Sequence, residues 1–182
     1  MRDWLARLVD RIRGAAGVDR SDAAIVRRLR ARGVRIGEDC RIYSTEFSTE
    51  PYLVTIGDGV GIAGGVKFLT HDGAARLRKA RRPGIQLLGP ISIGADSFIG
   101  ENAILLPGTS IGRDCIVVAG SVVRGPIPDN SLVMGNPAKV VGRASLFLDR
   151  LERNPNALDT FGMPEATRRA TILRHFGLEN PS

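Results

Sequence analysis

Residues 93–123 read IGADSF IGENAI LLPGTS IGRDCI VVAGSV V, and an aliphatic residue opens every group of six. These aliphatic positions are Ile93, Ile99, Leu105, Ile111, Val117 and Val123. A period of six does not fit an α-helix, which has about 3.6 residues per turn. Because six is even, it keeps the same face of a strand inward from one repeat to the next. A fixed short period of this kind is typical of a solenoid.

Small residues and glycines also recur within this period. The fifth position of the successive groups holds Ser97, Ala103, Thr109, Cys115 and Ser121, and Gly follows the aliphatic residue at Gly94, Gly100 and Gly112. We expect each hexapeptide to form a short strand and a tight corner, where the small residue fits and Gly supplies backbone freedom. Such coils stack about 4.8 Å apart and bury one continuous column of Ile, Val and Leu.

The same frame appears from Ile36 onward, which divides the chain into three parts. Residues 34–143 form the predicted solenoid, interrupted lightly at residues 43–53 and fully by a loop at residues 72–86. Residues 1–33 are predicted as an N-terminal helical segment, with an apolar stripe that begins at Trp4. Residues 144–182 are predicted as a C-terminal helical appendage with helices at 146–151 and 164–176. We expect this appendage to cap the open end of the solenoid, where strand edges would otherwise stay unpaired.

Composition restricts the class of protein. The chain has 182 residues, of which 43% are hydrophobic, and a net charge of +7 that comes mainly from arginine. It contains no apolar run long enough to cross a bilayer and no signal-peptide core, so we expect one soluble, cytoplasmic domain. Aromatic residues are scarce and no nucleic-acid motif is present, which argues against nucleic acid as a partner. The charge instead favours a phosphate-bearing cofactor and a charged small acceptor.

The arginine-rich faces of residues 1–32 leave two interpretations open. An amphipathic helix with a basic face binds a membrane surface in some proteins. The same pattern fits a helix that packs on its own solenoid or on a partner subunit. Both interpretations predict exposed arginines, so the sequence does not separate them.

Neither a metal site nor a thiol chemistry is expected. Cys40 and Cys115 both fall on the small-residue position of the repeat, which predicts two inward-packed thiols. A hydratase on a solenoid scaffold needs three His ligands for each zinc ion, and this chain has only His71 and His175. The glycines of residues 59–64 match the spacing of a dinucleotide fingerprint, but repeats lie on both sides where that motif needs a helix.

His71 is the candidate general base. It lies where a predicted strand gives way to the loop at residues 72–86, in the sequence Thr70-His71-Asp72-Gly73, whereas His175 lies in the C-terminal helical pattern. The imidazole is the side chain that accepts a proton most readily near neutral pH. A general base also needs an acceptor that orients its second ring nitrogen. Glu46 and Glu50 are our candidates because a segment one coil earlier stacks beneath His71, and a backbone carbonyl would also serve.

The repeat, the single His before a loop and the terminal Gly135-Asn136-Pro137-Ala138-Lys139 together resemble the hexapeptide-repeat acyltransferases. The resemblance covers residues 34–143 and points to the branch of maltose and galactoside O-acetyltransferases, xenobiotic acetyltransferases and polysaccharide O-acetyltransferases. It implies a left-handed parallel β-helix, a homotrimer, and an acetyl-CoA site in each cleft between subunits. It also matches His71 to the catalytic His of the family. The left hand comes from the resemblance alone.

The resemblance further implies a set of binding residues. Gly100, Ala119 and Gly120 would keep a groove open for the pantetheine arm, and Arg124, Arg143 and Lys139 would bind the phosphates of the cofactor. Lys139 is equally well interpreted as an ordinary exposed lysine. Tyr43 and Tyr52, together with the two glutamates, could line the acceptor pocket. The arginines of the loop suggest an anionic acceptor, and a solvated loop is the simpler interpretation of the same residues.

The expected function is therefore an acetyl-CoA-dependent O-acetyltransferase that acts on a hydroxyl of a saccharide or saccharide-like acceptor. We expect direct attack on the thioester with no covalent acyl-enzyme, and backbone N–H groups that hold the oxyanion. The first alternative is an N-acetyltransferase that acts on an amino sugar or a nucleotide-linked amino sugar. The alternative from another class is a non-catalytic solenoid scaffold.

Overall fold

A computed structural model describes residues 20–78 and 81–179 of the chain. The part of the predicted N-terminal helical segment that contains Trp4 lies outside these residues. The chain divides into two compact units. Residues 20–148 form one unit and residues from Asp149 onward belong to the other.

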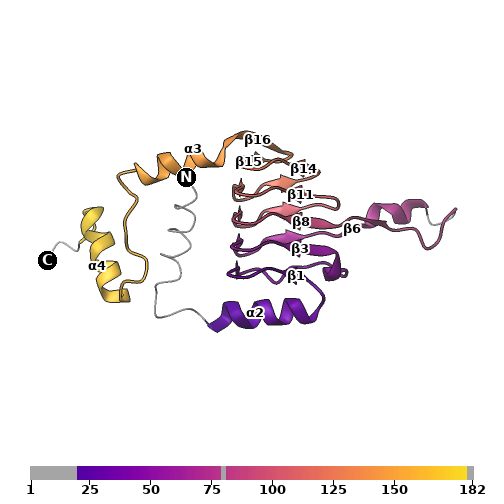
Figure 1. Cartoon of the computed structure of the whole chain (residues 1–182), viewed down its shortest axis with the longest axis horizontal. Helices are drawn as coiled ribbons and strands as arrows, with labels where there is room; N and C mark the ends of the chain where they lie inside the picture. The colour runs from indigo at the N-terminus through magenta and orange to yellow at the C-terminus, as the bar shows by residue number, and fades with distance from the viewer. Residues whose placement is uncertain (1–19, 79–80, 180–182) are drawn as a thin grey trace. The chain divides into compact units, whose positions relative to one another are not determined.

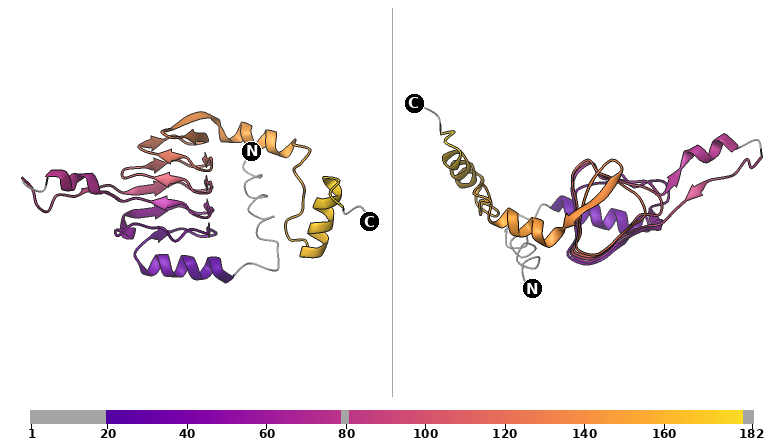
Figure 2. Two further views of the ribbon diagram at one scale, coloured as in Figure 1. Left: turned by 180° about the vertical axis from the view of Figure 1, so that it is seen from behind. Right: turned by 90° about the horizontal axis from the view of Figure 1, so that it is seen from above.

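Short parallel strands of the first unit stack in coils to form three sheets (Figure 1). The first sheet contains, in order, β1 (Arg35–Ile36), β3 (Val54–Ile56), β8 (Ile91–Ile93), β11 (Ser110–Ile111) and β14 (Pro126–Ile127). The parallel strands of the second are β2 (Arg41–Ile42), β4 (Gly61–Ile62), β9 (Phe98–Ile99), β12 (Ile116–Val117) and β15 (Ser131–Gly135). The third contains β5 (Lys67–Phe68), β10 (Ile104–Leu105) and β13 (Val122–Val123). The chain visits the sheets in turn, and successive coils lie over one another when viewed from above (Figure 2).

The parallel register places equivalent inward residues of neighbouring coils on each other. Ile99 pairs with Ile62 in the coil before it and with Val117 in the coil after it. All the aliphatic residues of the six-residue period between Ile93 and Val123 are at most 3% exposed and belong to one hydrophobic core. The predicted column of Ile, Val and Leu is therefore confirmed, and the chain is mainly strand with a few helices.

The glycines that directly follow the inward aliphatic residues have a different role from the one expected. Gly94 and Gly100 do not adopt positive φ, and a Cβ added to either would lie 2.5 Å from backbone atoms of the next coil. The left-handed backbone of the corners is instead adopted by residues such as Asp96 and Asn102, each with a φ of 57°. The expectation that these glycines supply backbone freedom is wrong, because what they permit is the close approach of neighbouring coils.

Each end of the stack of coils is covered. Helix α2 (Arg20–Ala31) contacts β1 and β2 and buries Leu29 in the core. At the other end, β16 (Ala138–Arg143) pairs antiparallel with β15. We expected the helical appendage to cover this strand edge. It is β16 that does so, because the chain folds back on itself after Gly135.

Two further helices follow, close to the predicted positions: α3 (Ala144–Glu152) and α4 (Glu165–His175). None of the helices in the described ranges combines the length and the apolar character that a membrane crossing requires. Cys115 is buried, Cys40 is partly buried, and both are free thiols.

The full interruption of the repeat is an antiparallel hairpin. It consists of β6 (His71–Asp72), the 3-10 helix η2 (Gly73–Arg78) and β7 (Leu87–Leu88), and we call residues 71–88 the hairpin. His71 pairs with Leu88 at its base, and the hairpin projects from the coils (Figure 1). It is inserted between the third sheet and the first, at a corner that the last coil turns with only Arg124 and Gly125 between β13 and β14.

Candidate functional site

His71 is placed at a corner of the solenoid by the strand that precedes it. The N–H of Leu69 donates to the carbonyl of Leu105 at 2.9 Å, so the ladder of the third sheet continues past β5. Thr70 is fully buried, and His71 then begins the hairpin with its side chain 35% exposed. The sheet therefore fixes the backbone that leads into His71, while its imidazole remains accessible to solvent.

A segment of the coil below lies directly against this corner. Phe47 and Phe68 form a parallel bridge, and their rings stack with centroids 4.2 Å apart and planes inclined by 8°. The N–H of Phe68 donates to Glu46 O, and the N–H of Ser48 donates to Phe68 O, both at 3.0 Å. This buried aromatic pair fixes the offset of the irregular segment, and residues 48–50 therefore lie beside His71.

Glu50 and His71 are in direct contact. His71 Nδ1 lies 2.9 Å from Glu50 Oε2, and the side chain of Glu50 is only 13% exposed. The hydroxyl of Thr49 donates to Oε1 at 2.6 Å and that of Thr70 donates to Oε2 at 2.8 Å. The hydrogen bond from Thr49, followed by those from His71 and Thr70, lowers the pKa of Glu50 from 4.5 to about 2. The carboxylate is therefore ionised near neutral pH.

This arrangement determines which ring nitrogen of His71 carries the proton. An ionised carboxylate only accepts hydrogen bonds, so Nδ1 of the neutral imidazole must be the donor to Glu50. The lone pair of Nε2 is then free to take a proton from a hydroxyl or an amine. Glu50 would stabilise the imidazolium that results, which is the chemistry of a general base with an orienting acceptor.

The other predicted orienting group lies elsewhere. The carboxylate of Glu46 is 3.5 Å from the ammonium of Lys67, and both side chains are about half exposed. Of the two predicted tyrosines, Tyr52 lies in the 3-10 helix η1 (Pro51–Leu53) that follows Glu50, and Tyr43 follows β2. Both are exposed.

Sequence reasoning missed the hydroxyls around the pair. Ser48 Oγ lies 3.1 Å and Thr49 Oγ1 lies 3.4 Å from His71 Nδ1, in addition to the contact of Thr70 with Glu50. Thr49 and Thr70 directly precede Glu50 and His71, so their positions were a usable signal. Thr70 also continues the inward alternation of Val66 and Phe68, where an apolar residue would have been expected.

The predicted cofactor residues fall into two groups. Gly100 is buried against Ala119 of the next coil, whereas Gly120 is exposed, has a φ of 71° and leaves open space where a Cβ would stand. Arg124 and Lys139 are exposed, as is Arg143. Arg124 follows β13 at the same corner at which His71 follows β5, and the two other cations lie on β16, which contacts β13.

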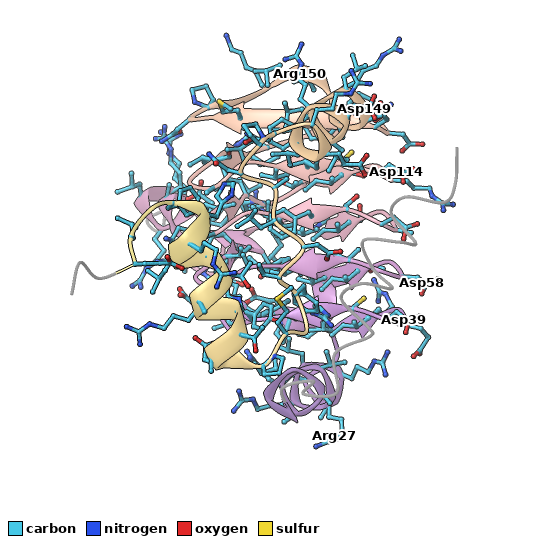
Figure 3. All side chains as sticks on the ribbon, turned by 90° about the vertical axis from the view of Figure 1, so that its left-hand side faces the viewer. Arg27, Asp39, Asp58, Asp114, Asp149 and Arg150 are labelled. Atoms are coloured by element: carbon cyan, nitrogen blue, oxygen red, sulfur yellow. The ribbon has the colours of Figure 1, made fainter. Side chains whose placement is uncertain are left out.

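Acidic residues gather at a different corner, between the first sheet and the second. Figure 3 shows Asp39, Asp58 and Asp114 along this edge of the coils. Burial, and then the neighbouring charges of Asp96 and Asp129, raise the pKa of Asp114. Within the described part of the chain, no group of three or more His, Cys, Asp or Glu side chains is arranged to hold a metal ion.

The second histidine belongs to the other compact unit. His175 Nε2 lies 3.0 Å from Asn156 Oδ1, and its ring contacts Phe176 edge to face. His71 therefore remains the candidate base.

Comparisons with known proteins identify hexapeptide-repeat proteins and acetyltransferases as similar to this chain. A family model described as the hexapeptide repeat of succinyl-transferase matches residues 90–124. Protein CapG of Staphylococcus aureus is 42% identical over 130 residues, which cover 70% of this chain and 76% of CapG. A putative acetyltransferase of S. aureus (strain MRSA252) is 46% identical over 61 residues, which are 34% of this chain and 31% of that protein.

Two solved structures share the architecture. Galactoside acetyltransferase in complex with coenzyme A is 33% identical, with a TM-score of 0.53 over 62% of this chain and 56% of that chain. A hexapeptide-repeat acetyltransferase from Vibrio cholerae is 24% identical, with a TM-score of 0.53 over 79% of this chain and 90% of that chain. The second comparison bears on the fold alone.

Proposed function

Because this chain belongs to the hexapeptide-repeat acetyltransferases, we propose that it transfers an acetyl group from acetyl-CoA to a hydroxyl of a saccharide or saccharide-like acceptor. The observation that carries this proposal is the 2.9 Å contact between His71 Nδ1 and the ionised Glu50. The contact orients an imidazole whose free nitrogen suits the activation of a hydroxyl.

In the proposed mechanism, His71 Nε2 takes the proton of the acceptor hydroxyl while the oxygen attacks the thioester carbonyl. Backbone N–H groups hold the oxyanion of the tetrahedral intermediate. The intermediate collapses with cleavage of the C–S bond, and the imidazolium returns its proton to the departing thiolate. The products are the acetylated acceptor and free coenzyme A, and His71 ends neutral.

The proposed cofactor site belongs to the assembled protein. We expect a left-handed β-helix that forms a homotrimer, with acetyl-CoA between subunits, and the coenzyme A held by galactoside acetyltransferase supports this choice of co-substrate. Gly100, Ala119 and Gly120 would border the pantetheine arm. The cations at the β16 end, Arg124, Lys139 and Arg143, would bind its phosphates. Replacing Lys139 and Arg143 with Ala should raise the KM for acetyl-CoA, and an unchanged KM would place the phosphates elsewhere.

The acceptor is proposed to bind beside Glu50, where Tyr52 and, from the preceding turn of the same coil, Tyr43 would offer rings and hydroxyls to a polyol. A thiol-release assay with acetyl-CoA and a panel of sugars, amino sugars and nucleotide-linked sugars tests the proposal. We expect release only when a suitable acceptor is present. Hydroxylamine cleaves an O-acetyl ester but leaves an N-acetyl amide intact, so treating the product separates the main proposal from the amine alternative. A failure to release thiol with every acceptor would favour the scaffold.

Contact of residues 1–32 with a membrane surface is a separate proposal. It is supported by the exposed Arg27 and Arg28 of α2. In vesicle flotation, recovery of the protein with anionic vesicles should fall when both arginines are replaced with Gln. Equal recovery of the two forms would end the idea.

A further inference from the structure

Buried hydroxyls in the solenoid follow one rule, with a single exception among the described residues. The buried Ser and Thr side chains are those of Ser44, Thr70, Ser97, Thr109, Ser121 and Ser131. All but one donate to backbone carbonyls, namely those of Val66, Gly112, Leu106, Val118 and Pro128, at 2.6–3.0 Å. Thr70 instead donates to a side chain, Glu50 Oε2, at 2.8 Å. The other hydroxyls stabilise the backbone of the coils, whereas the hydroxyl of Thr70 contacts a side chain of the candidate site.

The position of Thr70 makes this contact informative. Thr70 is 0% exposed and continues the inward alternation of Val66 and Phe68. A hydroxyl in such a place costs free energy unless it is hydrogen-bonded, and Val has nearly the same shape without that cost. The hydrogen bond that Thr70 makes is to the carboxylate oxygen that also contacts His71 Nδ1.

His71 has competing partners at the same nitrogen. Ser48 Oγ lies 3.1 Å and Thr49 Oγ1 lies 3.4 Å from Nδ1. If Oε2 of Glu50 moved away, the hydroxyl of Ser48 could donate to Nδ1, and the proton of the neutral ring would then reside on Nε2. That tautomer has no lone pair to offer an acceptor hydroxyl. Thr49 donates to Oε1, the other carboxylate oxygen, so the position of Oε2 depends on the hydrogen bond from Thr70.

We propose that Thr70 is a positioning residue for the acetyl transfer, because its hydroxyl holds Glu50 Oε2 against His71 Nδ1 and so keeps the proton off Nε2. This inference rests on the proposed role of His71 as the base. It assigns to Thr70 no contact with the substrate. Its effect passes through Glu50 to the tautomer of the imidazole.

The tautomer can be measured without any substrate by ¹⁵N NMR of the imidazoles in the full chain. His71 and His175 are the only two histidines, so a His175→Gln variant assigns their signals. When the ring of His71 is neutral, the wild type should show Nδ1 protonated and Nε2 without a proton. Thr70→Val should show a mixture with Nε2 protonated, and Thr70→Ser should restore the wild-type pattern. Thr109→Val removes an equally buried hydroxyl that donates to backbone carbonyls, and it should leave the pattern unchanged.

Kinetics provide a second readout. Thr70→Val should lower kcat about tenfold or more, as expected when a charged group loses a hydrogen bond, with the KM for acetyl-CoA within about twofold. Thr70→Ala makes the same comparison if the Val variant does not fold. An unchanged ¹⁵N pattern in a folded variant without the hydroxyl would overturn the proposal. If no acceptor supports turnover, the proposed function fails but the ¹⁵N comparison still decides the role of Thr70.

Discussion

Glu46 and Glu50 lie on one segment, four positions apart, yet their surroundings differ. Glu50 contacts His71 and accepts two threonine hydroxyls, whereas Glu46 pairs with Lys67 at the surface. Glu50→Gln should lower kcat about 10²- to 10⁴-fold, because an amide can donate to Nδ1 and favour the wrong tautomer. Glu46→Gln is the matched control and should stay within about twofold. Steady-state kinetics with one acceptor check both, and equal losses in the two variants would contradict the assignment.

Glu50 also predicts a pH dependence of stability. Its pKa is lowered to about 2 in the folded chain from an ordinary value of 4.5, so the folded state binds this proton less readily than the unfolded state. The carboxylate therefore stabilises the fold above pH 4.5, and this contribution is lost as the pH falls toward 2. Urea unfolding of the wild type and of Glu50→Gln should differ most above pH 4.5 and converge in stronger acid. If the difference in stability between the wild type and Glu50→Gln grew as the pH falls, the pKa of Glu50 would not be lowered in the folded state.

The strands make a prediction of their own, because inward and outward residues alternate along each. In β8, Ile93 is 3% exposed and packs between Ile56 and Ile111, while Ser92 faces outward and donates to Ser110. Ile93→Ala should destabilise the protein by about 2–5 kcal/mol, as expected for a buried aliphatic side chain. Ser92→Ala should cost less than about 1 kcal/mol. Urea unfolding measures both, and similar costs would argue against a shared interior column.

We expect the hairpin to bind the negative charge of an anionic acceptor. Its arginines 76, 78, 81 and 82 are exposed, and residues 73–88 contain no Asp or Glu. If the acceptor carries a phosphate, replacing Arg81 and Arg82 with Gln should raise its KM about tenfold, and added salt should weaken binding to the wild type in the same way. A neutral sugar is the control and should be affected less than twofold. Turnover of neutral sugars alone would remove the anionic acceptor.

The regular part of the solenoid could be predicted from the sequence, because the same interactions recur in every coil. The spacing of Ile93, Ile99 and Leu105 determines which residues face inward, and parallel stacking then follows from burial and backbone pairing. The expected role of Gly94 and Gly100 was wrong because the limiting factor at these positions is the distance between coils, which a single coil does not reveal. The hand of the helix came only from resemblance, since an even period is the same for either hand.

The site was less predictable, because it lies where the repeat fails. His71 could be identified as the histidine at a strand end, but the choice between Glu46 and Glu50 depends on the irregular segment before Pro51. That offset is determined by the stack of Phe47 on Phe68, a contact between coils that no local pattern records. The hydroxyl network around Glu50 depends on the same offset. The sequence positions of Thr49 and Thr70 indicate that their hydroxyls lie near the pair, but the offset determines which oxygen each one contacts.

At the scale of the whole molecule, we propose that a stacked solenoid presents one imidazole that activates an acceptor for acetyl transfer. The most direct test is the rate of coenzyme A release from acetyl-CoA, measured as the acceptor is titrated, for the wild type and for His71→Ala. We predict that the wild-type rate rises to saturation and that the variant loses about 10²- to 10⁴-fold of kcat, with only the acceptor-independent background retained. A folded His71→Ala variant that turns over within a few-fold of the wild type would show that His71 is not the general base.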